Sequence, residues 1–97
     1  MEEVRLEFVT YYEKQEEIAD RFRKIRKSKK VSQERLSVIS GVSYASIRRF
    51  EKTGDISLAS LVKLAIALRL YNDIDNLFKR ERIYSSIEEV IKEAKNG

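Results

Sequence analysis

The sequence predicts a single, all-helical domain. The 97 residues contain no proline and only three glycines, so few residues interrupt a helix. Hydrophobic residues make up 42% of the chain, which is enough for the core of a small domain. Apolar residues also recur at helical spacing through the middle of the chain. We therefore expect five helices within residues 16–78, an N-terminal arm over residues 1–15, and a linker and C-terminal helix over residues 79–97.

The first two predicted helices are separated by a short polar segment. The first covers residues 16–28, and three residues at helical spacing form its apolar face: Ile18, Phe22 and Ile25. The second covers residues 33–40 and follows Ser32, whose hydroxyl can accept a hydrogen bond from a backbone N–H at the helix start. We expect the second helix to bury Leu36 and Ile39.

A glycine separates the second helix from the third. Gly41 follows residue 40, and a glycine just past a helix end can take the left-handed conformation. We expect Val42 to pack inward at this turn. Ser43 then caps a third helix over residues 44–52, whose buried side has two large apolar residues, Ile47 and Phe50.

Two further helices complete the predicted core. Thr53, Gly54 and Asp55 end the third helix, and Ser57 caps the fourth. Five apolar residues form the expected inward side of the fourth helix: Leu58, Leu61, Leu64, Ala65 and Leu68. A short fifth helix is predicted around three more apolar residues that would close the core: Ile74, Leu77 and Phe78.

The two ends of the chain allow more than one interpretation. Apolar residues alternate with charged ones at positions 4–8, which favours a strand, although Val4, Phe8 and Tyr11 also fit a helix. We expect an extended arm there. Residues 86–89 form a capping-box pattern before an apolar face, which predicts an amphipathic C-terminal helix. An isolated element of this kind is marginal in water, so each end should pack on the core, a second copy or a partner.

Charge is distributed unevenly along the chain. The formal net charge is +4, and residues 21–30 carry seven basic residues and no acid. Residues 1–20 carry seven acids and two basic residues. A solvated helix face would give a similar pattern, but segregation of this kind also indicates a polyanionic partner.

The composition excludes several kinds of chemistry. The chain has no cysteine and no histidine, which rules out a disulfide scaffold, a Cys/His zinc site and a Ser-His-Asp triad. We predict no catalytic residue, no metal and no cofactor. The longest apolar run, residues 61–70, is shorter than the roughly 20 residues of a spanning helix, and no secretory leader is evident. We expect a cytoplasmic protein without membrane attachment.

Residues 33–52 have the pattern of a helix-turn-helix, in which the second helix lies in the DNA major groove. Gln33 would stand at the start of the supporting helix, where its amide and free backbone N–H groups can meet a phosphate. Arginine binds guanine through paired hydrogen bonds to O6 and N7. The expected exposed face of the second helix carries Tyr44, Ala45, Arg48 and Arg49, with two hydroxyls, Ser43 and Ser46, near its start.

Residues 16–78 resemble the phage-repressor and Cro-type helix-turn-helix domain, the XRE-like family, which has the lambda-repressor-like fold. The endings FEKTG and SLASLVKLAIAL also resemble the family pattern. The resemblance implies base contacts from Tyr44, Ala45 and Arg49. It implies backbone contacts from six residues: Gln33, Ser43, Ser46, Arg48, Arg26 and Lys27. It further implies a structural ion pair between Arg26 and Glu51. Two departures are Ser37 at a position where the family prefers alanine, and the absence of a proline before the fourth helix.

The resemblance also suggests a role. Single domains of this kind usually act as dimers on half-sites about 34 Å apart. With no second domain for a small-molecule ligand, a metabolite sensor is not expected. The stretch LRLYNDIDNLFKRERIYSSIEEVIKEA resembles the tail of HipB-type antitoxins, the partners of HipA-type kinases. We therefore expect a homodimeric autorepressor of double-stranded DNA and an antitoxin with a toxin partner. The alternatives are a stand-alone phage-type repressor and a protein-binding adaptor with the same fold.

Overall fold

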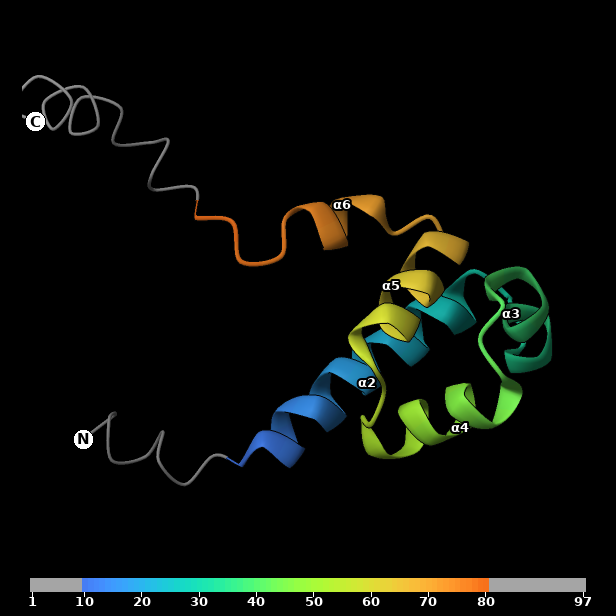
Figure 1. Ribbon diagram of the computed structural model, residues 1–97, viewed down its shortest axis with the longest axis horizontal. Helices are drawn as coiled ribbons and strands as arrows, with labels where there is room; N and C mark the ends of the chain where they lie inside the picture. Colours follow the sequence, from blue (N-terminus) through green and yellow to red (C-terminus); the bar gives the residue numbers. More distant parts are fainter. Residues whose placement is uncertain (1–9, 81–97) are drawn as a thin grey trace, which may run out of the picture.

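The computed structural model describes residues 10–80 (Figure 1). In that range it is all-helical, as predicted, and contains no strand. The five helices are α2 Tyr11–Ser28, α3 Gln33–Ser40, α4 Tyr44–Thr53, α5 Leu58–Ala67 and α6 Tyr71–Asp75. Most of the expected N-terminal arm and the expected C-terminal helix lie outside the described residues.

The start of α2 differs from the prediction. The helix begins at Tyr11 rather than Glu16, so residues 11–15 are helical and were wrongly expected in an extended arm. Thr10 caps the helix, because its hydroxyl accepts a hydrogen bond from the backbone N–H of Glu13 at 3.2 Å. Threonine followed three positions later by glutamate is the residue pair of a capping box, which is a local signal for a helix start.

Aliphatic and aromatic side chains from α2, α3, α4 and α5 meet in one core. Helix α2 packs on α4, α3 packs on α4 and α5, and α5 packs on α6. The rings of Phe22 and Phe50 join α2 to α4 edge to face, with centroids 5.4 Å apart. The buried residues of this cluster are Ala19, Phe22, Leu36, Val42, Ile47, Phe50, Leu64 and Leu68.

Several residues that we expected in the core are exposed. They are Ile18, Ile39, Leu58, Leu77 and Phe78. Helical spacing identifies an apolar face, but the neighbouring helices cover only part of that face. On α2, Ala19 and Phe22 are buried and Ile18 is exposed. Helix α6 ends at Asp75, so Leu77 and Phe78 follow the helix and do not close the core. The exposed fraction of Phe78 is 87%.

The two turns beside α4 both begin with a left-handed glycine. Gly41 has φ +75° and open space where a Cβ would lie. Gly54 has φ +82°, and a Cβ there would lie 2.6 Å from the backbone of Gln15 on α2. The Gln15 side-chain amide donates to the Gly54 carbonyl at 3.3 Å, so the end of α4 lies directly against α2. Only glycine fits this approach at position 54.

Ser37, which stands where the family prefers alanine, makes a hydrogen bond outside α3. Its hydroxyl donates to the carbonyl of Val42 at 2.8 Å. This hydrogen bond ties α3 to the turn that leads into α4.

Candidate nucleic-acid interface

Helix α4 lies at one outer edge of the described domain, and α6 lies at the opposite edge (Figure 1). The side of α4 that faces the core buries Ile47, Phe50 and Glu51. Its other side is exposed and carries four of the predicted contact residues: Tyr44, Ala45, Arg48 and Arg49. This arrangement leaves one long side of α4 open to a partner.

Two serines form the start of α4. The Ser43 hydroxyl accepts a hydrogen bond from the backbone N–H of Ser46 at 3.1 Å, which makes Ser43 the N-cap. The same hydroxyl donates to the Ser46 hydroxyl at 2.8 Å. Both side chains therefore have partners within the helix start, and their contact with a DNA backbone stays a prediction.

Arg26 and Glu51 join α2 to α4 through a buried ion pair. Arg26 Nε lies 2.6 Å from one carboxylate oxygen of Glu51, and Nη2 lies 2.7 Å from the other. Nη1 donates to the carbonyl of Val31 at 2.8 Å. The side chains are 8% and 3% exposed. Hydrogen bonding to Glu51 raises the pKa of Arg26 above its ordinary value, although burial acts in the opposite direction. Arg26 thus points inward, and its predicted contact with a phosphate stays a prediction.

Gln33 extends this network to α3. It is the first residue of α3, and its Nε2 donates to the Glu51 carboxylate at 2.9 Å. The side chain is half-buried, and it stands where the N–H groups at the start of α3 are directed outward. The sequence predicted this position at the start of α3, but it did not reveal that Glu51 holds the glutamine side chain in place.

A groove between α2 and α4 collects most of the nearby positive charge. Gln33 and Glu51 line it together with five cationic side chains: Arg23, Arg26, Lys27, Arg48 and Lys52. Lys27, Arg48 and Lys52 form no ion pair with any carboxylate of residues 10–80. The Arg48 guanidinium lies over the Tyr44 ring, 5.6 Å from its centroid, in a cation–π arrangement. These three cations give the groove an unbalanced positive charge.

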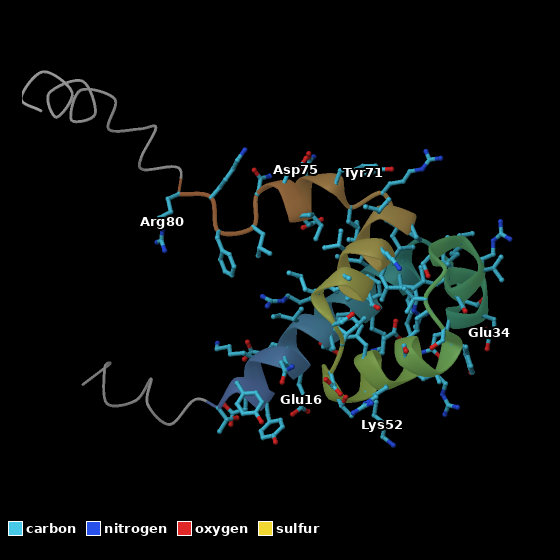
Figure 2. The ribbon with its side chains drawn as sticks, viewed as in Figure 1. Glu16, Glu34, Lys52, Tyr71, Asp75 and Arg80 are labelled. Atoms are coloured by element: carbon cyan, nitrogen blue, oxygen red, sulfur yellow. The ribbon has the colours of Figure 1, made fainter. Side chains whose placement is uncertain are left out.

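Two cations of this groove, Lys52 and Arg23, were not among the contact residues predicted from the sequence. Lys52 lies four residues after Arg48, so both fall on the same side of α4, and Figure 2 shows Lys52 near the end of that helix. Arg23 pairs with Asp20 on α2, and Lys24 pairs with the other oxygen of Asp20 at 2.9 Å. The hydrogen bond with Lys24, and to a smaller extent the contact with Arg23, hold the pKa of Asp20 below its ordinary value. The i, i+4 spacing was the available signal for Lys52.

Glu34 places a carboxylate near the starts of α3 and α4. A hydrogen bond from its own backbone N–H is the main cause that lowers the pKa of Glu34, with smaller effects from the Tyr44 and Ser32 hydroxyls. Figure 2 shows Glu34 at the outer side of α3. Because this carboxylate is next to Tyr44, it limits the positive charge at the first turn of α4.

Arg49 lies in a second groove, away from Arg48. This groove is lined by Arg49, Thr53 and Asp55 from the end of α4, and by Tyr11, Tyr12 and Gln15 from α2. Arg49 Nη2 lies 2.6 Å from Asp55 Oδ2, and the side chains are 70% and 56% exposed. The Tyr11 and Tyr12 rings stack with centroids 4.2 Å apart. The two neighbouring arginines thus lie at different edges of the exposed side of α4, and each lines a different groove.

Two other kinds of site, a metal cluster and a membrane-spanning helix, are absent from the described residues. Residues 10–80 contain no group of histidine, cysteine, aspartate and glutamate side chains arranged to hold a metal ion. Within the same range, no helix has the length and apolar content to cross a membrane. The basic groove and the exposed side of α4 are therefore the features that we interpret.

The order of helices and the exposed α4 define a helix-turn-helix protein. The family model for the helix-turn-helix matches residues 22–71, from the middle of α2 to the start of α6. This match covers just over half of the chain, so the chain belongs to the XRE-like helix-turn-helix family, whose members are DNA-binding transcriptional regulators. A search of curated proteins found no match.

Proposed function

We propose that the protein is a sequence-specific regulator that binds double-stranded DNA as a homodimer, represses its own gene and serves as the antitoxin of a toxin partner in the cytoplasm. The observation that carries the DNA-binding part is the exposed side of α4. It lies beside a groove with three cations that form no ion pair within residues 10–80: Lys27, Arg48 and Lys52. Phosphate contacts of this kind supply most of the affinity for DNA.

In this proposal α4 enters the major groove and the α2–α4 groove receives the phosphate backbone. Tyr44, Ala45 and Arg49 would contact base edges, because they lie on the exposed side of α4. Lys27 and Arg48 would contact phosphates from the groove, and Gln33 would do so from the start of α3. The Arg26–Glu51 pair would hold α2 and α4 at the angle that places these contacts together.

Exposed apolar residues near α6 support the dimer and the toxin partner. Three large apolar residues are exposed on α6 and just after it: Tyr71, Leu77 and Phe78. Exposed apolar side chains in one region are typical of a surface that another protein covers. This region lies away from α4, so a partner there would leave the DNA-binding side open (Figure 1).

The experiment that tests the proposal measures binding to a duplex from the gene's own upstream DNA, at two salt concentrations, with a scrambled duplex as competitor. We expect tight, salt-sensitive binding that the scrambled duplex does not displace. Lys27→Ala should weaken binding to both duplexes alike and lower the salt slope by about 1. Equal binding to both duplexes would reject sequence specificity, and weak, salt-independent binding would favour a protein-binding adaptor.

A second measurement addresses the partner surface. Light scattering of the full chain alone should give the mass of a dimer. With the duplex, it should give the mass of one dimer and one duplex. A Phe78→Ser substitution removes the most exposed aromatic residue of that region without touching α4. A monomer that binds DNA as one copy per duplex would reject the dimer and leave only the DNA-binding part of the proposal.

A further inference from the structure

The pair of Arg49 and Asp55 has no evident role in folding. Both side chains are largely exposed, and only one nitrogen–oxygen contact joins them, at 2.6 Å. Exposed ion pairs of this kind contribute little to stability, because water screens the attraction and two long side chains lose freedom. The Arg49–Asp55 pair can instead affect which groups of a partner Arg49 contacts.

The position of Asp55 is fixed by the end of α4. Gly54 takes the left-handed conformation and lies against Gln15 of α2. The Thr53 hydroxyl accepts a hydrogen bond from the Asp55 backbone N–H at 3.1 Å and donates to the Arg49 carbonyl at 2.7 Å. The turn thus holds the Asp55 backbone next to the turn of helix that carries Arg49.

The contact leaves most of the guanidinium available. An arginine has five N–H donors, and a single contact to Asp55 through Nη2 uses one of them. Guanine offers two neutral acceptors, O6 and N7, which the remaining donors can still reach. A phosphate carries a negative charge, so the nearby carboxylate of Asp55 repels it and has already neutralised much of the Arg49 charge. The pair therefore favours a base edge over a phosphate.

We propose that Asp55 is a specificity-determining residue, which acts by preventing Arg49 from binding DNA phosphates while leaving it able to bind a guanine edge. The inference rests on the proposed function, in particular on Arg49 as a base-contacting residue. It gives Asp55 a repulsive role towards the wrong target, which is a common source of specificity. Asp55 would improve discrimination between sites without necessarily improving affinity for the correct one.

The test compares two duplexes, one selected from a random library by the wild-type protein and one scrambled from it. Fluorescence anisotropy gives the two affinities at one salt concentration, and their ratio is the readout. The variants are Asp55→Asn, Arg49→Ala and the double substitution. Asp75→Asn is the matched control, because it removes the same charge from α6, at the opposite edge of the domain from α4 (Figure 2).

We expect Asp55→Asn to tighten binding to the scrambled duplex and to lower the ratio by up to about fivefold, the equivalent of a strong exposed ion pair. Asp75→Asn should leave the ratio unchanged. In the Arg49→Ala background, Asp55→Asn should no longer change the ratio, because the effect acts through Arg49. Circular dichroism melts of each variant check that it is folded.

The possible failures are distinct. An unchanged ratio in Asp55→Asn would overturn the inference about Asp55 alone. The same drop in the Arg49→Ala background, or in Asp75→Asn, would also overturn it, since it would show a general charge effect. If Arg49→Ala kept the full ratio, Arg49 would not contact a base, and the inference would fall with that assignment. If the wild-type protein selected no preferred duplex, the proposed function itself would be rejected together with the inference.

Discussion

Two arginine–carboxylate pairs include residues of α4 that are two positions apart, Arg49 and Glu51, and the pairs differ in burial and in the number of contacts. Arg26 and Glu51 are almost fully buried and share two nitrogen–oxygen contacts. Arg49 and Asp55 are largely exposed and share one. The first pair joins two helices, and the second joins a helix to the turn that follows it.

The difference shows how burial decides what an ion pair does. A buried carboxylate that loses its partner cannot be solvated by water, so the buried pair is costly to break. An exposed carboxylate returns to water at little cost. We therefore expect substitutions at the buried pair to change folding, and substitutions at the exposed pair to change binding and leave folding nearly intact.

The largest effect is expected for Glu51→Gln. This substitution leaves the buried Arg26 charge without its carboxylate, which should lower the free energy of unfolding by about 3–5 kcal/mol. Urea denaturation followed by circular dichroism measures this. A loss below about 1 kcal/mol, the range of exposed pairs, would show that the two pairs do not differ in the way that their burial indicates.

The next largest effect on the free energy of unfolding is expected at Gly54, and it should exceed the effect at Gly41. Gly54→Ala should lower the free energy of unfolding by about 2–4 kcal/mol, since left-handed strain adds to crowding against Gln15. Gly41→Ala is the matched control, with the same strain but open space, and should lose only about 1–2 kcal/mol. Equal losses in the two variants would mean that α2 moves aside easily, and that Asp55 is held less firmly than the turn suggests.

Arg49→Ala tests the exposed pair through binding. We expect a loss of about 1–3 kcal/mol on the preferred duplex, with base choice relaxed at one position, because a guanine-contacting side chain is removed. The free energy of unfolding should change by no more than about 1 kcal/mol, the upper end of the range for exposed ion pairs. Isothermal titration with duplexes that vary at single positions provides the measurement. Binding like that of the wild type would contradict the assignment of Arg49 to a base.

The smallest effect on folding is expected for Asp55→Asn. The exposed pair contributes between 0 and about 1 kcal/mol, so the unfolding midpoint in urea should hardly move. A measurement beside Glu51→Gln under the same conditions gives the comparison directly. A loss as large as that of Glu51→Gln would show that Asp55 has a structural role that its exposure does not indicate.

Local signals allowed much of the fold to be predicted from the sequence. Ser32, Ser43 and Ser57 each cap the helix that was expected to follow them. Gly41 and Gly54 end the preceding helices in the left-handed conformation. These features depend on a few neighbouring residues, so they can be predicted from the local sequence. The early start of α2 at Thr10 had a local signal of the same kind, which we overlooked in favour of the alternation at positions 4–8.

Features that depend on packing could not be predicted in the same way. Ile18 and Leu58 fit the apolar faces of their helices, yet both are exposed, because the other helices of residues 10–80 do not cover them. The hydrogen bond from Gln33 to Glu51 joins residues on two helices. The Arg49–Asp55 pair depends on how the turn after Gly54 directs the chain. For these features, the position of one helix against another has to be known first.

The short connections between the helices also have a consequence for the rate of folding. The segments 29–32, 41–43, 54–57 and 68–70 join successive helices, and each has four residues or fewer. The chain contains no proline, so no slow peptide-bond isomerisation delays these turns. Small helical domains with local connections fold within microseconds to milliseconds. After unfolding, the domain should therefore regain its basic groove in a single phase, on a time scale of microseconds to milliseconds.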